Sequence, residues 1–193
     1  AVRAGVRAHV QAHSGDLEAA GAYLEAGLRH LAPPPPRLTA VGGLSGSGKS
    51  TFARLIAPGL GASPGAVVLR TDEARKRLLG AAPRASLPAS AYSPAFSEEV
   101  YDSLFAAARA LLDAGRAVVV DATFIQPELR GRAARLAQEA GVPFRGVWLQ
   151  AAPEVLAQRI EGREGDASDA TVATLKMQLD RDVGPIDWVR VDA

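Results

Sequence analysis

Residues 43–50, with the sequence GLSGSGKS, constrain the fold of this chain more than any other stretch, and we call them the phosphate loop. They match the pattern G-x-x-x-x-G-K-[ST], in which glycines let the backbone wrap around a phosphate group with several N–H groups turned inward. The lysine of this pattern, here Lys49, reaches the β- and γ-phosphates of a nucleotide, and the next hydroxyl, Ser50, coordinates Mg²⁺. The alternative is a glycine-rich turn without a ligand.

The segments on either side of the loop favour the phosphate site over a plain turn. Leu38–Val41 is apolar, as a buried strand would be, and Thr51–Ala57 has the pattern of a helix. This order aims the helix N-terminus and its dipole at the phosphates. We therefore predict ATP and Mg²⁺ as cofactors, with these nucleotide-binding residues: Gly43, Ser45, Gly46, Ser47, Gly48, Lys49, Ser50 and Thr51.

Length and composition narrow the class of protein. With 193 residues, of which 48% are hydrophobic, the chain is long enough for one domain and a short extension. It has no cysteine and a net charge of +1, which argues against disulfides, thiolate metal sites and a duplex nucleic-acid partner. No apolar run approaches the roughly 18 residues of a membrane span, so we expect no membrane partner, and the absence of cysteine fits a reducing cytoplasm. The chain begins without Met, and we expect it to be part of a longer protein.

The chain divides at a run of prolines. Residues 1–32 have helical periodicity in two pieces, with Asp16 placed to cap the second helix. Residues 33–37 form a stiff proline-rich linker, because proline has no N–H to donate. Residues 38–193 form the main domain. The helical piece is too short to fold alone, so we expect it to pack on the main domain or to be the tail of an upstream one.

Strands and helices alternate through the main domain. The predicted strands are mostly apolar, as in a parallel sheet covered on both faces; they are Leu38–Gly42, Ala66–Arg70, Ala117–Asp121, Phe144–Gln150 and Trp188–Val191. We expect helices from about Lys49, Asp72, Ser97, Pro127, Pro153 and Ser168, and a loop or short cap over residues 80–94. The pattern predicts a doubly wound α/β fold, in which ligands bind beyond the carboxyl ends of the strands.

Charged residues follow the second and third predicted strands. Asp72 and Arg75 are one helical turn apart. They form either a helix cap with a surface ion pair, or a general base with an arginine that holds the acceptor, and the residues alone favour neither. Asp121 follows three valines at the end of the third strand, where a ligand of Mg²⁺-bound water is typical. We favour this role over a polar strand end, with Asp72 as a second metal contact.

Two arginines, Arg159 and Arg163, lie four residues apart before the polar stretch 164–169. That composition indicates a lid that closes over the γ-phosphate and brings positive charge to the transition state. The alternative is a pair of solvated arginines neutralised by Glu161 and Glu164, and we favour the lid. Packing and acceptor-binding roles both stay open for four further residues: Arg130, Arg132, Tyr92 and Tyr101.

The order of these motifs resembles that of the small P-loop kinases of the predicted-kinase type, which are related to polynucleotide 5′-kinases, zeta toxins and gluconate kinases. The resemblance covers residues 38–193 and rests on GLSGSGKST, TDEARKRL, VVVDATF, and QRIEGR followed by SDAT. It implies a P-loop NTPase fold with a five-stranded parallel sheet in the order 2-3-1-4-5, helices on both faces and a small lid. It also implies that Asp72 is the general base, that Arg75 contacts the acceptor, and that Arg159 and Arg163 serve ATP and the transition state.

A second resemblance covers the whole chain. The stretch YLEAGLRHLAPPPPRLTAVGGLSGSGKST is similar to the junction in bacterial bifunctional proteins that join an aminoglycoside-phosphotransferase-like domain to a C-terminal ATP-binding domain. This implies that residues 1–32 are the last helices of an upstream phosphotransferase-like domain, which would be a partner of the main domain. No aminoglycoside chemistry carries over, because the upstream catalytic parts lie outside this sequence.

Together these features predict an ATP- and Mg²⁺-dependent kinase that transfers the γ-phosphoryl group to a hydroxyl acceptor. The acceptor is a small molecule or a nucleic-acid 5′-OH, and the near-neutral charge argues against a long polynucleotide. The alternative is an ATP-operated regulatory module that gates a partner domain and has no acceptor. The predicted catalytic residues are Lys49, Asp72, Arg75, Arg159 and Arg163, and the predicted metal contacts are Ser50, Asp121 and Asp72.

Overall fold

The computed structural model describes residues 1–162 and 168–193 and contains a five-stranded parallel sheet. The order of the strands in the sheet is β2-β3-β1-β4-β5. The predicted fold class and strand order are confirmed, and the strand ends agree with the prediction to within one residue. The strands are β1 (Leu38–Gly43), β2 (Val67–Arg70), β3 (Val118–Asp121), β4 (Phe144–Gln150) and β5 (Val189–Asp192).

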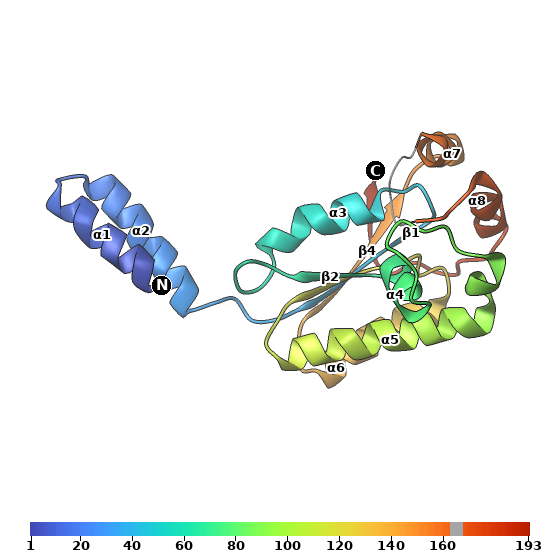
Figure 1. Ribbon diagram of the computed structural model, residues 1–193, viewed down its shortest axis with the longest axis horizontal. Coiled ribbons are helices and arrows are strands. Elements are labelled where there is room, and N and C mark those ends of the chain that lie inside the picture. Colours follow the sequence, from blue (N-terminus) through green and yellow to red (C-terminus); the bar gives the residue numbers. More distant parts are fainter. Residues whose placement is uncertain (163–167) are drawn as a thin grey trace.

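Helices cover both faces of the sheet (Figure 1). α3 (Lys49–Ile56) lies on one face, and α5 (Pro94–Asp113) and α6 (Pro127–Glu139) lie on the other. Among the described residues, no helix has the length and apolar character that a membrane crossing needs. The other helices that follow β1 are α4 (Thr71–Leu78), α7 (Pro153–Glu161), α8 (Val172–Leu179) and the 3-10 helices η1 (Ala57–Gly59) and η2 (Ala89–Tyr92).

Strand β1 lies in the middle of the sheet and contributes to a hydrophobic core on each face. All six of its residues are buried. Leu38 and Ala40 join the larger core under α5 and α6, whereas Val41 joins a second core with Ala53 of α3. This alternation is the two-residue period of a strand. Because both faces are covered, the sequence of β1 has no polar side, and the phosphate loop that follows it starts from a fixed point.

Two helices begin at residues other than those predicted. α5 starts before the predicted Ser97, because the Ser93 hydroxyl caps the helix and a proline, which suits the first turn, follows it. α8 starts after the predicted Ser168, where Thr171 and Thr174 form a reciprocal capping box. Both corrections come from capping residues that are visible in the sequence.

The N-terminal residues form a two-helix hairpin that stands apart from the sheet (Figure 1). α1 (Val2–His13) and α2 (Leu17–Leu31) pack on each other, and the Asp16 carboxylate caps α2 by accepting the N–H of Ala19, as predicted. Residues 33–37, which form neither helix nor strand, connect α2 to β1. Several large apolar side chains of the hairpin are exposed: Val2, Val6, Val10, Leu17, Leu24, Leu28 and Leu31.

The carboxyl ends of the parallel strands meet at one edge of the sheet, where ligands bind in folds of this kind. A cavity of about 1140 Å³ lies at this edge. It exceeds the roughly 300–1,000 Å³ that is typical of a pocket for one small ligand, so it offers room for two substrates.

Candidate active site

Close backbone approaches fix the shape of the phosphate loop. Gly43 has a φ of +140°, and a Cβ there would lie 2.4 Å from the carbonyl oxygen of Leu149. Gly46 has a φ of +84°, and a Cβ there would lie 2.5 Å from the carbonyl oxygen of Leu156. Gly48 caps α3 in the left-handed conformation with open space beside it. The first two glycines are therefore needed for packing, whereas the third leaves the helix N-terminus open to an anion.

One peptide group of the phosphate loop is held on both sides. The Lys49 ammonium donates to the Leu44 carbonyl at 2.8 Å. The N–H of the same peptide group, on Ser45, donates to Gln178 Oε1 of α8 at 2.8 Å. Lys49 thus folds back over its own loop, where the lysine of this motif contacts phosphates. The contact from Gln178 was not predicted, because residues so far apart in the chain give no local signal.

A hydrogen-bonded network joins the ends of β2 and β3 to the start of α3. The Ser50 hydroxyl donates to Asp121 Oδ2 at 2.6 Å, so two of the predicted metal contacts lie side by side. Arg70 donates from Nε to the same carboxylate oxygen at 3.1 Å and from Nη2 to Ser50 Oγ at 2.9 Å. Arg70 was not predicted as a site residue. Its place at the end of β2, in register with Asp121 at the end of β3, is a signal that could have identified it.

Asp72 lies in the first turn of α4, at the wall of the cavity. Burial raises the pKa of its carboxyl above the ordinary value of 3.8, the negative charge of Asp121 raises it further, and Lys49 and Arg70 oppose the rise. The Ser168 hydroxyl, which also lines the cavity, opposes the rise in this pKa as well. Asp72 therefore lies within electrostatic reach of the phosphate loop, and its raised pKa suits a group that accepts a proton.

Arg75 is buried one turn further along α4 and holds residues 80–93, which we call the cap loop. Its Nη1 donates to the Ala91 carbonyl and, at 3.4 Å, to the Ser97 hydroxyl, and its guanidinium lies 4.8 Å from the ring centre of Tyr92. Its Nε is buried and has no hydrogen-bond partner among the described residues. Because Arg75 is buried and lines the cavity, the alternative of a solvated surface ion pair does not hold.

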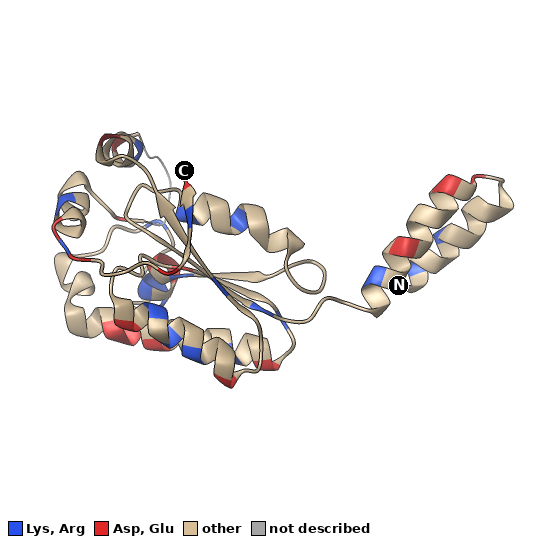
Figure 2. Ribbon diagram, turned by 180° about the vertical axis from the view of Figure 1, so that it is seen from behind, with Lys and Arg blue, Asp and Glu red and all other residues tan. Residues whose placement is uncertain are grey.

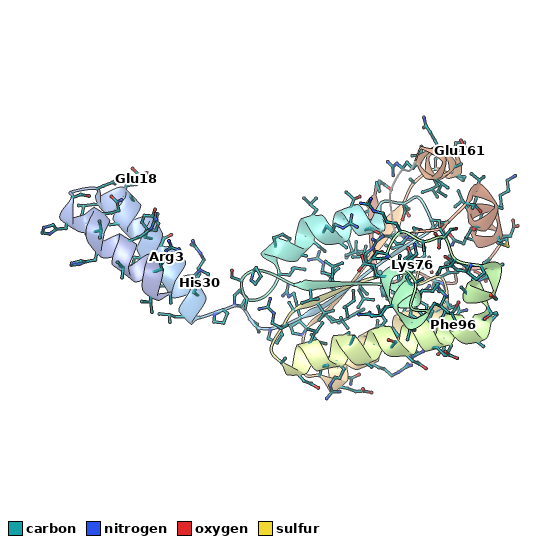
Figure 3. All side chains as sticks on the ribbon, in the orientation of Figure 1. Arg3, Glu18, His30, Lys76, Phe96 and Glu161 are labelled. Atoms are coloured by element: carbon teal, nitrogen blue, oxygen red, sulfur yellow. The ribbon has the colours of Figure 1, made fainter. Side chains whose placement is uncertain are left out.

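Asp169, in the segment 168–171 that precedes α8, is a second anchor of the cap loop. Its Oδ2 accepts hydrogen bonds from the Tyr92 hydroxyl at 2.7 Å and from the Leu87 N–H at 3.2 Å, and its Oδ1 lies 3.6 Å from the Lys76 ammonium. Lys76 is buried on α4 (Figure 3) and also donates to the Pro83 carbonyl at 3.2 Å. The sequence indicated only that Asp169 belongs to a polar stretch, and this convergence of three groups was not predicted.

Of the two predicted lid arginines, the structure describes Arg159 but not Arg163. Arg159 lies on α7, and its exposed side chain lines the cavity. Arg163 falls within residues 163–167, outside the described part of the chain. Arg159 is therefore in place to contact a nucleotide, and the role of Arg163 stays a prediction.

The cavity brings most of the predicted site residues together. Two predicted phosphate-loop residues, Gly43 and Ser47, are buried and do not line it. The predicted residues that do line it are Ser45, Gly46, Gly48, Lys49, Ser50, Thr51, Asp72, Arg75, Asp121 and Arg159.

The residues with open roles divide into two pairs. Tyr92 and Tyr101 line the cavity, Tyr101 from α5 with a buried ring. Arg130 is buried and pairs with backbone carbonyls, and Arg132 forms salt bridges with acidic residues of α5. The two arginines therefore connect structural elements and do not face the cavity. The carbonyls that Arg130 binds are those of Phe124, Ile125, Val183 and Pro185.

The residues present fit a magnesium–nucleotide ligand. Ser50 and Asp121 offer oxygen atoms, the ligand type that Mg²⁺ prefers. In the part of the chain that the structure describes, no cluster of three or more His, Cys, Asp or Glu could hold a metal ion by itself. Mg²⁺ is usually bound by one or two carboxylates together with substrate phosphates, so this donor set suits an ion that is shared with a nucleotide.

Comparison with known proteins agrees with this geometry. A family model described as "AAA domain" matches residues 38–183. The chain belongs to this AAA domain family. An uncharacterized protein of Mycobacterium tuberculosis (strain ATCC 25618 / H37Rv) is 37% identical over 201 residues, which cover 95% of this chain and 39% of that protein. The AAA domain chain thus spans less than half the length of this curated relative.

Solved kinase structures share the fold of this AAA domain. The APS kinase CysC of M. tuberculosis, in complex with AMPPNP and APS, is 28% identical with a TM-score of 0.51, and the match covers 67% of this chain and 70% of that chain. A gluconokinase from Sinorhizobium meliloti 1021 is 25% identical with a TM-score of 0.50, and the match covers 81% and 82% of the two chains. The AAA domain is therefore a P-loop kinase-like domain, and the likeness to an AMPPNP complex supports nucleotide binding.

Proposed function

We propose that the chain is an ATP- and Mg²⁺-dependent kinase of the cytoplasm that transfers the γ-phosphoryl group to a hydroxyl acceptor. One observation carries the proposal: a single cavity is lined by the phosphate loop, by the Ser50–Asp121 pair and by Asp72, whose pKa is raised. The loop and the pair suit any enzyme that binds a magnesium–nucleotide complex. The half-buried carboxylate of Asp72 beside them suits an acceptor that must lose a proton.

The donor half of the cavity binds and polarises the phosphates in this proposal. The amides of the phosphate loop and the Lys49 ammonium bind the phosphate oxygens. Ser50 and Asp121 hold the magnesium ion, which supplies positive charge at the phosphates. Arg159 and Arg163 neutralise charge on the group in transfer, as arginine does well because it can donate two parallel hydrogen bonds.

The acceptor half removes a proton and orients the hydroxyl. Asp72 accepts the hydroxyl proton as the oxygen takes the phosphoryl group and ADP leaves. Arg75 holds the acceptor from the side of the cap loop. Hydroxyl and amide groups line this half of the cavity, which suits a small polar molecule with several hydroxyl groups. These lining residues are Ser86, Tyr92, Ser97, Tyr101, Thr123 and Gln126.

The distribution of charge favours a small acceptor over a nucleic-acid 5′-OH. Figure 2 shows basic and acidic residues interspersed along α5 and α6. Binding of a polynucleotide draws on a continuous basic stripe that follows the phosphate backbone. We therefore propose a small hydroxyl compound, with a 5′-OH oligonucleotide as the competing acceptor.

Transfer of label from γ-labelled ATP tests the proposal. The protein is incubated with Mg²⁺, labelled ATP and a panel of small hydroxyl compounds, and separately with a 5′-OH oligonucleotide. We expect label on an acceptor, and we expect Lys49→Ala and Asp72→Ala each to lower transfer by at least about 10²-fold, the usual contribution of such a group. Asp72→Ala should largely retain nucleotide binding.

The same assay distinguishes the regulatory module from the kinase. Label found only in free phosphate across the whole panel would favour ATP hydrolysis that gates a partner domain. Unchanged transfer by Asp72→Ala would rule out Asp72 as the general base while leaving the kinase function standing.

A further inference from the structure

We propose that Asp169 is a positioning residue for the acceptor, and that residues 168–179 form a brace that joins the two halves of the cavity. The brace comprises the segment 168–171, which is neither helix nor strand, and α8 itself. Asp169 at one end shapes the cap loop, and Gln178 at the other end holds the phosphate loop. This inference deepens the kinase function proposed above and rests on it for the meaning of the two halves.

The cap loop depends on side chains for its position. Its backbone hydrogen bonds among the described residues are local, such as those from Ala85 to Ala82 and from Ala91 to Pro88. A loop without long-range backbone pairing is held only as firmly as its side-chain anchors hold it. Those anchors come from α4 and from the segment that precedes α8.

Asp169 holds the cap loop at two points and also faces a second anchor, Lys76. Its carboxylate accepts hydrogen bonds from the Tyr92 hydroxyl and the Leu87 N–H. It also faces the ammonium of Lys76, whose side chain is only 3% exposed. Tyr92 in turn lies over the guanidinium of Arg75. The Asp169 carboxylate thereby positions the backbone of the cap loop at Leu87. Through the ring of Tyr92 it also positions Arg75, the arginine that faces the acceptor.

The residue before Asp169 ties the brace to the chemistry. Ser168 lines the same cavity as Asp72, the group to which we assign proton removal, and its hydroxyl stabilises the charged form of that carboxylate. Two consecutive residues of the brace thus face the general base and the cap loop. A shift of this segment changes the relative position of the base and the acceptor-binding residues.

The other end of the brace grips the donor half. Gln178 Oε1 accepts the Ser45 N–H, which belongs to the peptide group whose carbonyl binds Lys49. α8 has 8 residues, about 12 Å of helix, and packs through the buried Leu175 on Leu156 of α7. A short helix that is capped and packed in this way transmits a displacement from one end to the other. Filling the phosphate loop should therefore tighten the cap loop.

Hydrogen exchange of the whole chain, read by mass spectrometry over peptides from residues 82–93, tests the brace. Asp169→Asn keeps the size of the side chain but removes its charge and one acceptor oxygen. We expect exchange in these peptides to accelerate at least about tenfold without nucleotide, because hydrogen bonds to a charged group are lost. The control Lys176→Gln, at an exposed position of α8, should match the wild type.

Addition of AMPPNP with Mg²⁺ tests the connection between the two ends. In the wild type we expect the nucleotide to slow exchange of the cap-loop peptides. In Gln178→Leu the nucleotide should still bind, the free energy of unfolding should fall by no more than the loss of one hydrogen bond, about 1 kcal/mol, and the slowing should disappear. A purely structural role of Gln178 would lower stability without removing this long-range response.

Each outcome decides part of the proposal. Unchanged cap-loop exchange in Asp169→Asn overturns the positioning role, and retained slowing in Gln178→Leu overturns the connection to the phosphate loop. If Asp169→Asn accelerates exchange along the entire chain, the test is repeated with Tyr92→Phe, which removes one hydroxyl. Faster exchange confined to the cap loop in this variant supports the positioning role of Asp169, and unchanged exchange overturns that role. The measurement without nucleotide needs no kinase activity, so failure of AMPPNP to bind counts against the proposed function alone.

Discussion

At the scale of single residues, Asp72 lies in surroundings that disfavour the ionised form of its carboxyl group. Burial and the neighbouring Asp121 raise the pKa of its carboxyl, so the folded protein keeps a proton there at pH values where the unfolded chain has lost it. The unfolded state then binds fewer protons than the native state, and stability falls as pH rises from the unfolded pKa through the folded pKa. A cost of this kind is common where a group is placed for function.

Asp72→Asn should therefore raise the free energy of unfolding at pH 7, measured by urea denaturation without nucleotide or Mg²⁺. The gain should exceed the roughly 0.5 kcal/mol of an ordinary surface substitution. It should shrink as the pH falls and vanish well below 3.8, the ordinary pKa, where the wild-type carboxyl is protonated in both states. Glu139→Gln, at an exposed position of α6, is the control and should change little. A variant less stable than the wild type at pH 7 would show that the attraction of Lys49 and Arg70 for the carboxylate outweighs burial.

Some site residues were predictable from the sequence because their signals are local. The phosphate loop is a contiguous motif, and Asp121 ends a strand whose valines mark it as buried. Arg70, Asp169 and Gln178 were not predicted, because each acts through a partner far along the chain. Gln178 and its partner Ser45, for example, are 133 positions apart, and no local pattern reports such a pairing.

At the scale of elements, the helices and strands followed the predicted order because each has its own period and boundaries. The strands are continuous apolar runs, and prolines open α6 and α7 as predicted. The errors came at α5 and α8, where more than one residue could cap the helix. The packing of elements on each other was harder to predict from the sequence. For example, nothing in the sequence shows that the phosphate loop contacts the backbone of α7 at Leu156.

That contact makes a prediction for Gly46→Ala. A Cβ at Gly46 would meet the carbonyl oxygen of Leu156 at 2.5 Å in a left-handed conformation, so the loop or α7 must shift. Gly141→Ala is a matched control, since Gly141 has a φ of +65° with nothing within 4 Å. We expect Gly46→Ala to lose roughly 1–3 kcal/mol more stability than the control, the usual cost of overpacking. Equal losses would mean that backbone strain alone accounts for both.

At the scale of the whole molecule, the hairpin and the α/β domain are built separately. Ala20 and Gly27 are the buried residues of α2, and α1 has none. The three hydrophobic clusters of the described residues draw their members from residues 38 onward. The division of the chain at residues 33–37 stays a prediction, as does an origin of the hairpin in an upstream phosphotransferase-like domain.

Deletion of residues 1–32 should leave the α/β domain folded. Because the hairpin adds no member to its cores, we expect the thermal midpoint to change by less than about 3 °C, which corresponds to roughly 1 kcal/mol in a domain of this size. Nucleotide affinity, measured by calorimetry with AMPPNP and Mg²⁺, should stay within about threefold, or about 0.7 kcal/mol. Loss of cooperative unfolding in the shortened chain would show instead that the hairpin belongs to the domain.

The two sides of the cavity differ in how firmly the rest of the fold holds them, and this difference has an evolutionary consequence. The phosphate loop continues a strand that is buried along its whole length, whereas the cap loop is attached through a few polar side chains. In the kinase proposed above, substitutions in residues 80–93 would therefore alter the choice of acceptor without disturbing the hydrophobic core or the donor site. A lineage built on this plan can acquire new substrates by changing one loop, while the machinery that handles ATP is inherited unchanged.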